Sequence, residues 1–102
     1  MFKLEPNPTF FAPVSIHVPG QGLGTFEAEF RHLAKAERDT FHAGLGETTN
    51  LDALAGIVTG WRGIDAPFSR DNLERLLDEY QGAVDALFKA YFTELYGAAV
   101  KN

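Results

Sequence analysis

The hydrophobic period of this chain changes from two residues to about 3.6 near residue 33, and this change constrains the fold most. Residues 14–18 and 26–30 each alternate apolar with polar side chains, which is typical of half-buried strands. The glycine-rich stretch 20–24 separates them, so the simplest interpretation is an antiparallel β-hairpin. Prolines keep residues 1–12 extended. A hairpin is marginally stable alone, so its apolar face must lie on the rest of the chain.

The rest of the chain reads as about four helices. Residues 34–43 are rich in helix formers, and three amphipathic runs follow over 51–61, 73–80 and 84–95. Asn50 is the expected N-cap of the second helix and Ser69 that of the third, while Gly97 is expected to end the last. The sequence therefore predicts an α+β fold in one domain, residues 1–102. The hairpin lies in 1–33, the helices in 34–97 and a frayed tail in 98–102.

Composition excludes several classes of protein. The 102 residues carry a formal net charge of -5, which argues against general nucleic-acid binding. The chain has no run of about 18 apolar residues, so no membrane span is expected. It contains no cysteine, which rules out disulfides and thiolate metal sites and fits a reducing cytoplasm. We expect no cofactor.

The aromatic residues of the helical part could serve a core or a partner. Adding Tyr96 to the last helix widens its apolar arc to roughly 180°, so two sides must be covered. The edge nearest Phe92 and Tyr96 could meet another protein, but we predict the central helix of the domain, because the core is the commoner place for aromatic residues. Trp61 is expected to anchor the core with its N–H bonded to a nearby carbonyl, the alternative being an interface hot spot.

A hydrolase triad is the catalytic alternative. If Val18 paired near Phe26, His17 would lie opposite Glu27 and Ser15 opposite Glu29 on the polar face of the hairpin. Ser15 and His17 would then stand about 7 Å apart on one strand, too far for a nucleophile–base hydrogen bond. Cross-strand polar pairing explains these residues better than catalysis does.

The sequence also lacks the patterns that are typical of phosphate-binding and metal-binding sites. A phosphate cradle opens into a helix, whereas the loop 20–24 runs into a strand. The three histidines are His17, His32 and His42; pairing the last two with Glu37 or Glu47 gives no zinc-ligand spacing on one helix face. Surface histidines are the simpler interpretation.

The residues taken together form a pattern that is more specific than any single one. It comprises Phe2-x-Leu4-x-x-Asn7-Pro8-Thr9-Phe10, Val18-Pro19-Gly20, Phe26-Glu27-Ala28-Glu29-Phe30, Gly60-Trp61, the turn from Asp65 to Phe68-Ser69, Leu73-x-x-Leu76-Leu77-x-x-Tyr80, and Tyr91 with Leu95. This pattern resembles the small tail assembly chaperones of long-tailed bacteriophages and prophages, over nearly the whole chain. Relatives often carry a proline where this chain has Gln81, which bears only on that turn.

The resemblance implies a non-enzymatic protein of the bacterial host cytoplasm that is absent from the mature virion. Such proteins are thought to coat the tape-measure protein and to help recruit tail-tube subunits. Self-association is a further expectation. The partner-binding residues we expect are Phe88, Phe92, Tyr96 and Trp61. The alternative is a minor structural component of the phage tail or head-tail joint.

Overall fold

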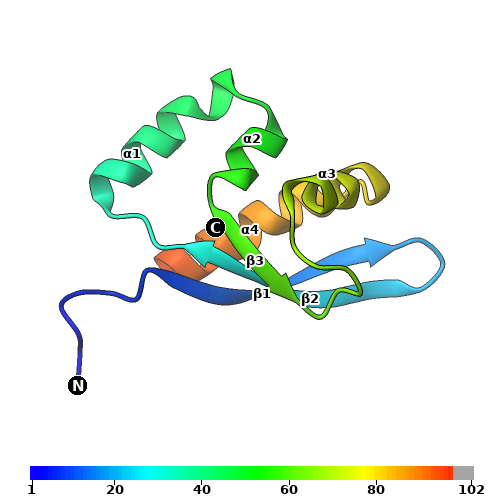
Figure 1. Ribbon diagram of the computed structural model, residues 1–102, viewed down its shortest axis with the longest axis horizontal. Helices are drawn as coiled ribbons and strands as arrows, with labels where there is room; N and C mark the ends of the chain where they lie inside the picture. Colours follow the sequence, from blue (N-terminus) through cyan, green and yellow to red (C-terminus); the bar gives the residue numbers. More distant parts are fainter. Residues whose placement is uncertain (98–102) are drawn as a thin grey trace.

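Three antiparallel strands form the sheet of the protein. A computed structural model describes residues 1–97, and the tail predicted at 98–102 lies outside them. Strands β1 (Thr9–Val18), β2 (Gly22–Arg31) and β3 (Val58–Arg62) lie in the order β1-β2-β3 (Figure 1). The predicted α+β class is confirmed, and the predicted hairpin is the β1–β2 part of a three-stranded sheet.

The hairpin turn is tighter than the sequence suggested. Gln21 donates its backbone N–H to the Val18 carbonyl at 2.9 Å, and Gly20 has a φ of 82°. With Pro19 before this glycine, the turn has the pattern of a type II β-turn. Val18 therefore pairs with Gly22, four residues from the partner that the sequence suggested. Strand β1 also begins at Thr9, earlier than the alternation over residues 14–18 suggested.

One face of the sheet is buried and the other faces outward. Along β1, Ala12, Val14 and Ile16 are buried while the residues between them are exposed, and β2 alternates in the same way. The helices gather on the buried side of the sheet, and α1, α2 and α3 lie above the strands in Figure 1. The fold thus has two layers, with its core between the sheet and the helices. The fully buried larger side chains of this core are Tyr91, Phe30, Leu54, Ile57, Leu73, Leu87 and Val14.

The helices are α1 (Lys35–Gly44), α2 (Asn50–Ala55), α3 (Arg70–Glu79) and α4 (Ala83–Tyr96), with a short 3-10 turn at Leu45–Glu47 after α1. Ser69 caps α3 as predicted, because its hydroxyl accepts the N–H of Asn72 at 3.0 Å. Thr49, and not Asn50, caps α2 through the N–H of Asp52. Gly97, with a φ of 83°, stands at the C-cap of α4.

The predicted helix over 51–61 was wrong in its second half. Helix α2 ends at Ala55, and residues 58–62 form the edge strand β3. The backbone carbonyl of Ile57 accepts the N–H of Arg31 at 2.8 Å, which starts the pairing with β2. Apolar spacing at 54, 57, 58 and 61 fits a helix equally well, so the choice depends on this pairing with a distant strand.

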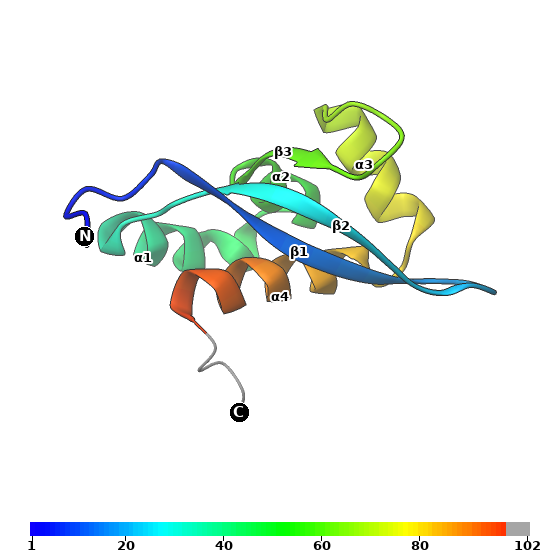
Figure 2. The same ribbon diagram turned by 90° about the horizontal axis from the view of Figure 1, so that it is seen from below.

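Helix α4 is the central helix of the fold. Its residues Ala83, Leu87 and Tyr91 are fully buried. It packs along β1 and also touches α2 and α3. Figure 2 shows it running below the sheet, with α1 and α3 at its two ends. The apolar arc of α4 thus has one part in the core and another part beyond it.

Proline occupies a defined place in strand β1. Pro13 pairs with Glu27 of β2, and because β1 is an edge strand the proline nitrogen need not donate to a neighbour.

Candidate protein-binding surface on helix α4

Three aromatic rings follow one another along α4, and we call them the aromatic strip: Phe88, Phe92 and Tyr96. They are four residues apart, so they share one helix face. Ring centroids of Phe88 and Phe92 lie 6.1 Å apart, and those of Phe92 and Tyr96 also 6.1 Å, with interplanar angles of 10° and 21°. The two phenylalanines are half-buried, while Tyr96 is 47% exposed. The strip thus runs from the core edge into solvent.

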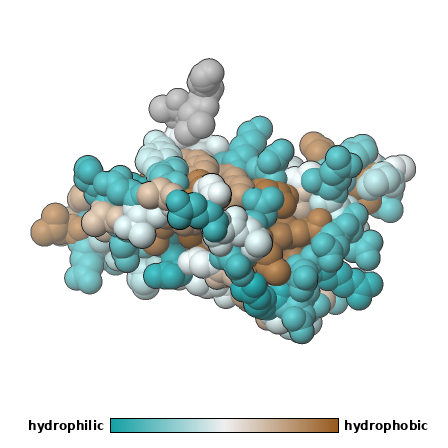
Figure 3. Space-filling model, turned by 90° about the horizontal axis from the view of Figure 1, so that it is seen from above, coloured by the Kyte–Doolittle hydropathy of each residue, from teal (hydrophilic) through white to brown (hydrophobic). Residues whose placement is uncertain are grey.

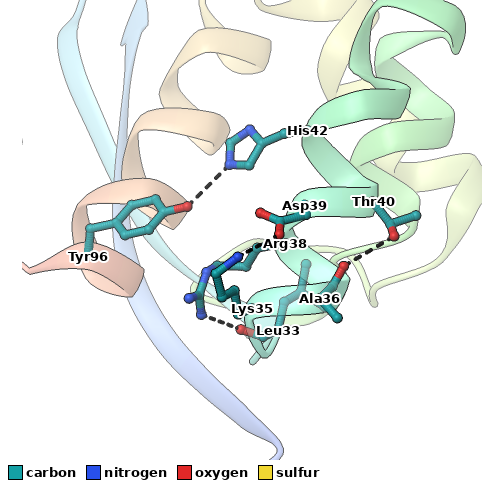
Figure 4. Close-up of polar contacts among 8 residues, drawn as sticks. All are labelled: Leu33, Lys35, Ala36, Arg38, Asp39, Thr40, His42 and Tyr96. Atoms are coloured by element: carbon teal, nitrogen blue, oxygen red, sulfur yellow. Dashed lines mark hydrogen bonds and ion pairs between the residues drawn. The ribbon is translucent and has the colours of Figure 1, made fainter.

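Helix α1 lies against this strip. The ring of Phe41 packs 6.4 Å from Phe88 and 6.3 Å from Phe92, and the imidazole of His42 stacks on Phe92 at 5.3 Å. Figure 4 shows His42 pointing from α1 toward Tyr96, where His42 Nε2 and the tyrosine hydroxyl are 3.2 Å apart. One exposed helix therefore covers part of an aromatic surface.

A cation completes the contact between the two helices. The Arg38 guanidinium lies 5.9 Å from the centroid of the Tyr96 ring. The same side chain donates to the Leu33 carbonyl at 2.9 Å, which holds it at the start of α1 (Figure 4). A guanidinium over a tyrosine face is attracted by the ring quadrupole.

The base of the strip is a buried tyrosine. Tyr91 packs against Phe30 at 5.0 Å and Phe10 at 5.9 Å, and its hydroxyl donates to the Arg31 carbonyl at 3.1 Å. Burial raises the pKa of Tyr91 to about 12, and the neighbouring Tyr96 adds to the shift. Because Tyr91 joins the sheet to α4, the strip stands on a fixed support.

Trp61 lies in a different part of the molecule from the strip. It belongs to β3, where its ring packs edge-on to Phe68 at 5.1 Å and Phe26 at 6.3 Å. Its Nε1 donates to the Ala66 carbonyl at 2.8 Å, which is the predicted bond of a structural anchor. No ring contact among residues 1–97 joins it to the strip.

The hairpin does not bring together the residues of the hypothetical triad. His17 lies opposite Leu23, and Ser15 lies opposite Thr25, with the two hydroxyl oxygens 3.1 Å apart. Glu29 accepts instead from the Thr9 hydroxyl at 2.8 Å. The predicted pairings with Glu27 and Glu29 were wrong because the turn is shorter. The polar face shows cross-strand pairing of polar side chains.

Among residues 1–97, a metal site would show as a cluster of ligating side chains, and a membrane span as a long apolar helix. Within them, no group of three His, Asp or Glu side chains is placed to hold a metal ion. No helix in that range has both the length and the apolar character needed to cross a bilayer.

The surface on the helical side is mixed. Figure 3 shows apolar side chains in separate patches among hydrophilic ones on this side. Two hollows flank α1 where it faces α2: one of about 380 Å³ beside Leu33 and Ala36, and one of about 340 Å³ beside Leu45 and Ala53. The covering role of Phe41 and His42 was missed by sequence reasoning. The only signal was that Phe41 is the one large apolar residue of its helix.

Comparison with known proteins places the chain in a family. Curated proteins and solved structures gave no match. The family model described as phage tail assembly chaperone matches residues 1–102, the whole chain. This agrees with the resemblance in the residues. The chain therefore belongs to the phage tail assembly chaperone family.

Proposed function

We propose that this chaperone binds the tape-measure protein of its phage through the aromatic strip and so helps to recruit tail-tube subunits. It acts without catalysis in the cytoplasm of the bacterial host and leaves before the tail matures. The observation that carries the proposal is the strip itself, with rings that run from the core edge to a 47% exposed tyrosine. Aromatic side chains with an apolar body and a polar tip are favoured at protein interfaces.

The acidic balance of the chain supports the same role. A protein that handles a long, aggregation-prone helical client needs apolar contact area in a frame that stays dissolved. The net charge of -5 supplies repulsion between copies, and the strip supplies contact area.

The test is co-purification of the tape-measure protein with wild-type chain and with a Phe92→Glu plus Tyr96→Glu variant. We expect wild type to retain the client and the double variant to lose it. Leu23→Glu is the matched control, because it places a carboxylate on a 74% exposed apolar residue at the hairpin tip. Circular dichroism checks that each variant folds. A folded double variant that still retains the client would remove the strip from the proposal.

Mass spectrometry of purified particles tests the departure from the tail. A chaperone is absent from virions, whereas the alternative, a minor component of the tail or head-tail joint, is present in fixed copy number.

A further inference from the structure

Helix α1 is attached to the domain more weakly than any other helix of comparable length. None of its ten residues is buried in the structure of residues 1–97. Only Phe41 inserts a large apolar side chain between α1 and α4. Hollows of about 380 and 340 Å³, both lined in part by Phe41, leave α1 incompletely packed where it faces α2. Few buried apolar contacts are the physical basis of local opening at low free-energy cost.

The ends of α1 are also weakly fixed. Ala34 stands at the N-cap, where alanine has no side-chain acceptor. The side-chain bonds at this end are those of Glu37, which accepts the Ala34 N–H at 3.0 Å, and of Arg38, which donates to the Leu33 carbonyl. Gly44 and Gly46 follow at the other end, on either side of Leu45 in the 3-10 turn. Glycines lower the cost of changing the backbone path here.

The contacts of α1 show which chemistry fits the strip. Phe41 places a ring among Phe88, Tyr91 and Phe92. Three residues earlier, on the same helix face, Arg38 places a cation over Tyr96. A helix that carries an aromatic residue, and a cation one turn before it, can therefore make both kinds of contact with the strip: ring packing on Phe88 and Phe92, and a cation over Tyr96.

We propose that α1 is a displaceable cover, and that a helical segment of the client replaces it on α4 with an aromatic residue in the place of Phe41. A basic residue one turn earlier in that segment lies over Tyr96. This inference rests on the proposed function, since it names the kind of client segment that the strip takes. The free chaperone thus shields its rings with its own helix until a longer amphipathic helix competes.

The cover lowers the apparent affinity for the client. If α1 were in place nine-tenths of the time, the apparent affinity would be about tenfold below that of the uncovered strip. Phe41→Ala removes the anchor of the cover and leaves the strip intact. We therefore expect it to strengthen binding of the tape-measure protein by up to about tenfold.

The experiment measures that affinity for wild type, Phe41→Ala and the control Lys35→Gln. The control changes an exposed side chain of α1 whose ion pair with Asp39 lies at the surface and contributes little to stability. The expected order is Phe41→Ala tightest, with wild type and Lys35→Gln equal. Weaker binding by a folded Phe41→Ala would overturn the inference, because α1 would then be part of the binding surface. Loss of binding in wild type itself would remove the proposed function.

Hydrogen exchange tests the cover without any client. In the free protein, α1 amides should exchange by local opening well before those of α3 and α4, and Phe41→Ala should abolish their protection while α4 keeps its own. With the client bound, α1 amides should exchange faster still and α4 amides more slowly. Exchange of α1 only through global unfolding, or protection of α1 by the client, would contradict the proposed displacement.

Discussion

Helices α1 and α3 have the same length of ten residues, but the domain holds them in opposite ways. Ser69 caps α3, and Leu73 places its whole side chain in the core. Helix α1 has an alanine at its N-cap and buries no residue within the described part of the chain, so Phe41 is its one large apolar anchor. The difference shows that a segment can form a helix without being packed firmly on the rest of the domain. The loosely packed helix, α1, is the one that lies on the aromatic strip.

The largest expected difference concerns the two anchors. Leu73→Ala should lower the free energy of unfolding by about 3 kcal/mol, because it empties a fully enclosed site in the core. Phe41→Ala removes more carbon atoms but should cost clearly less, because its site is half open to solvent. Urea unfolding followed by the fluorescence of Trp61 measures both. Equal losses would break the comparison.

The second prediction uses pH. The ordinary pKa of a tyrosine is 10.0, and that of Tyr91 in the folded protein is about 12. Between these values the unfolded chain holds fewer protons, so the free energy of unfolding should fall as pH rises from 10 to 12, by about 2 kcal/mol or less. Tyr91→Phe should remove this slope, and its loss of the bond to Arg31 should cost about 1 kcal/mol at neutral pH.

The same titration sharpens the contrast between the helices. Phe41→Ala should admit water to Tyr91 and move its pKa back toward 10.0, which absorbance of the tyrosinate reports. An unchanged pKa would show that α1 contributes nothing to the shielding of Tyr91.

A smaller effect is expected at the cap of α3. Ser69→Ala should cost about 1 kcal/mol of unfolding free energy, because the N–H of Asn72 loses its acceptor. Ser69→Asp, which retains an acceptor, is the control and should cost little. If both variants unfold at the wild-type urea concentration, the cap has no part in holding α3.

The smallest effect is expected where α1 lacks such a cap. Ala34→Ser supplies a hydroxyl acceptor at the N-cap and should stabilise α1 by a few tenths of a kcal/mol up to about 1 kcal/mol. Hydrogen exchange of the α1 amides measures this better than global unfolding does. Faster exchange in Ala34→Ser than in wild type would contradict the prediction.

Local signals in the sequence predicted much of the fold. The alternation around Val14 and Ala28 predicted the hairpin, and Ser69 with the leucine stripe from Leu73 predicted α3. These features depend on residues that are close together in the chain, so they can be predicted from the sequence alone. The central place of α4 also followed from the width of its apolar arc.

Features that depend on distant pairing were not predicted. The spacing of the apolar residues in 57–61 fits a helix or a strand. The segment forms a strand because it pairs with β2, beginning with the hydrogen bond from the Arg31 N–H to the Ile57 carbonyl. The hairpin register depended on a single turn, so a short turn at Pro19 moved every pairing. For the site, the sequence indicated Phe88, Phe92 and Tyr96 but not their cover, because one phenylalanine in α1 makes no periodic pattern.

Pro13 has a consequence for how copies of this protein meet. A proline in the middle of β1 offers no amide hydrogen toward the free margin of the sheet. Another chain that tried to extend the sheet there would find the ladder interrupted, which discourages fibril-like stacking.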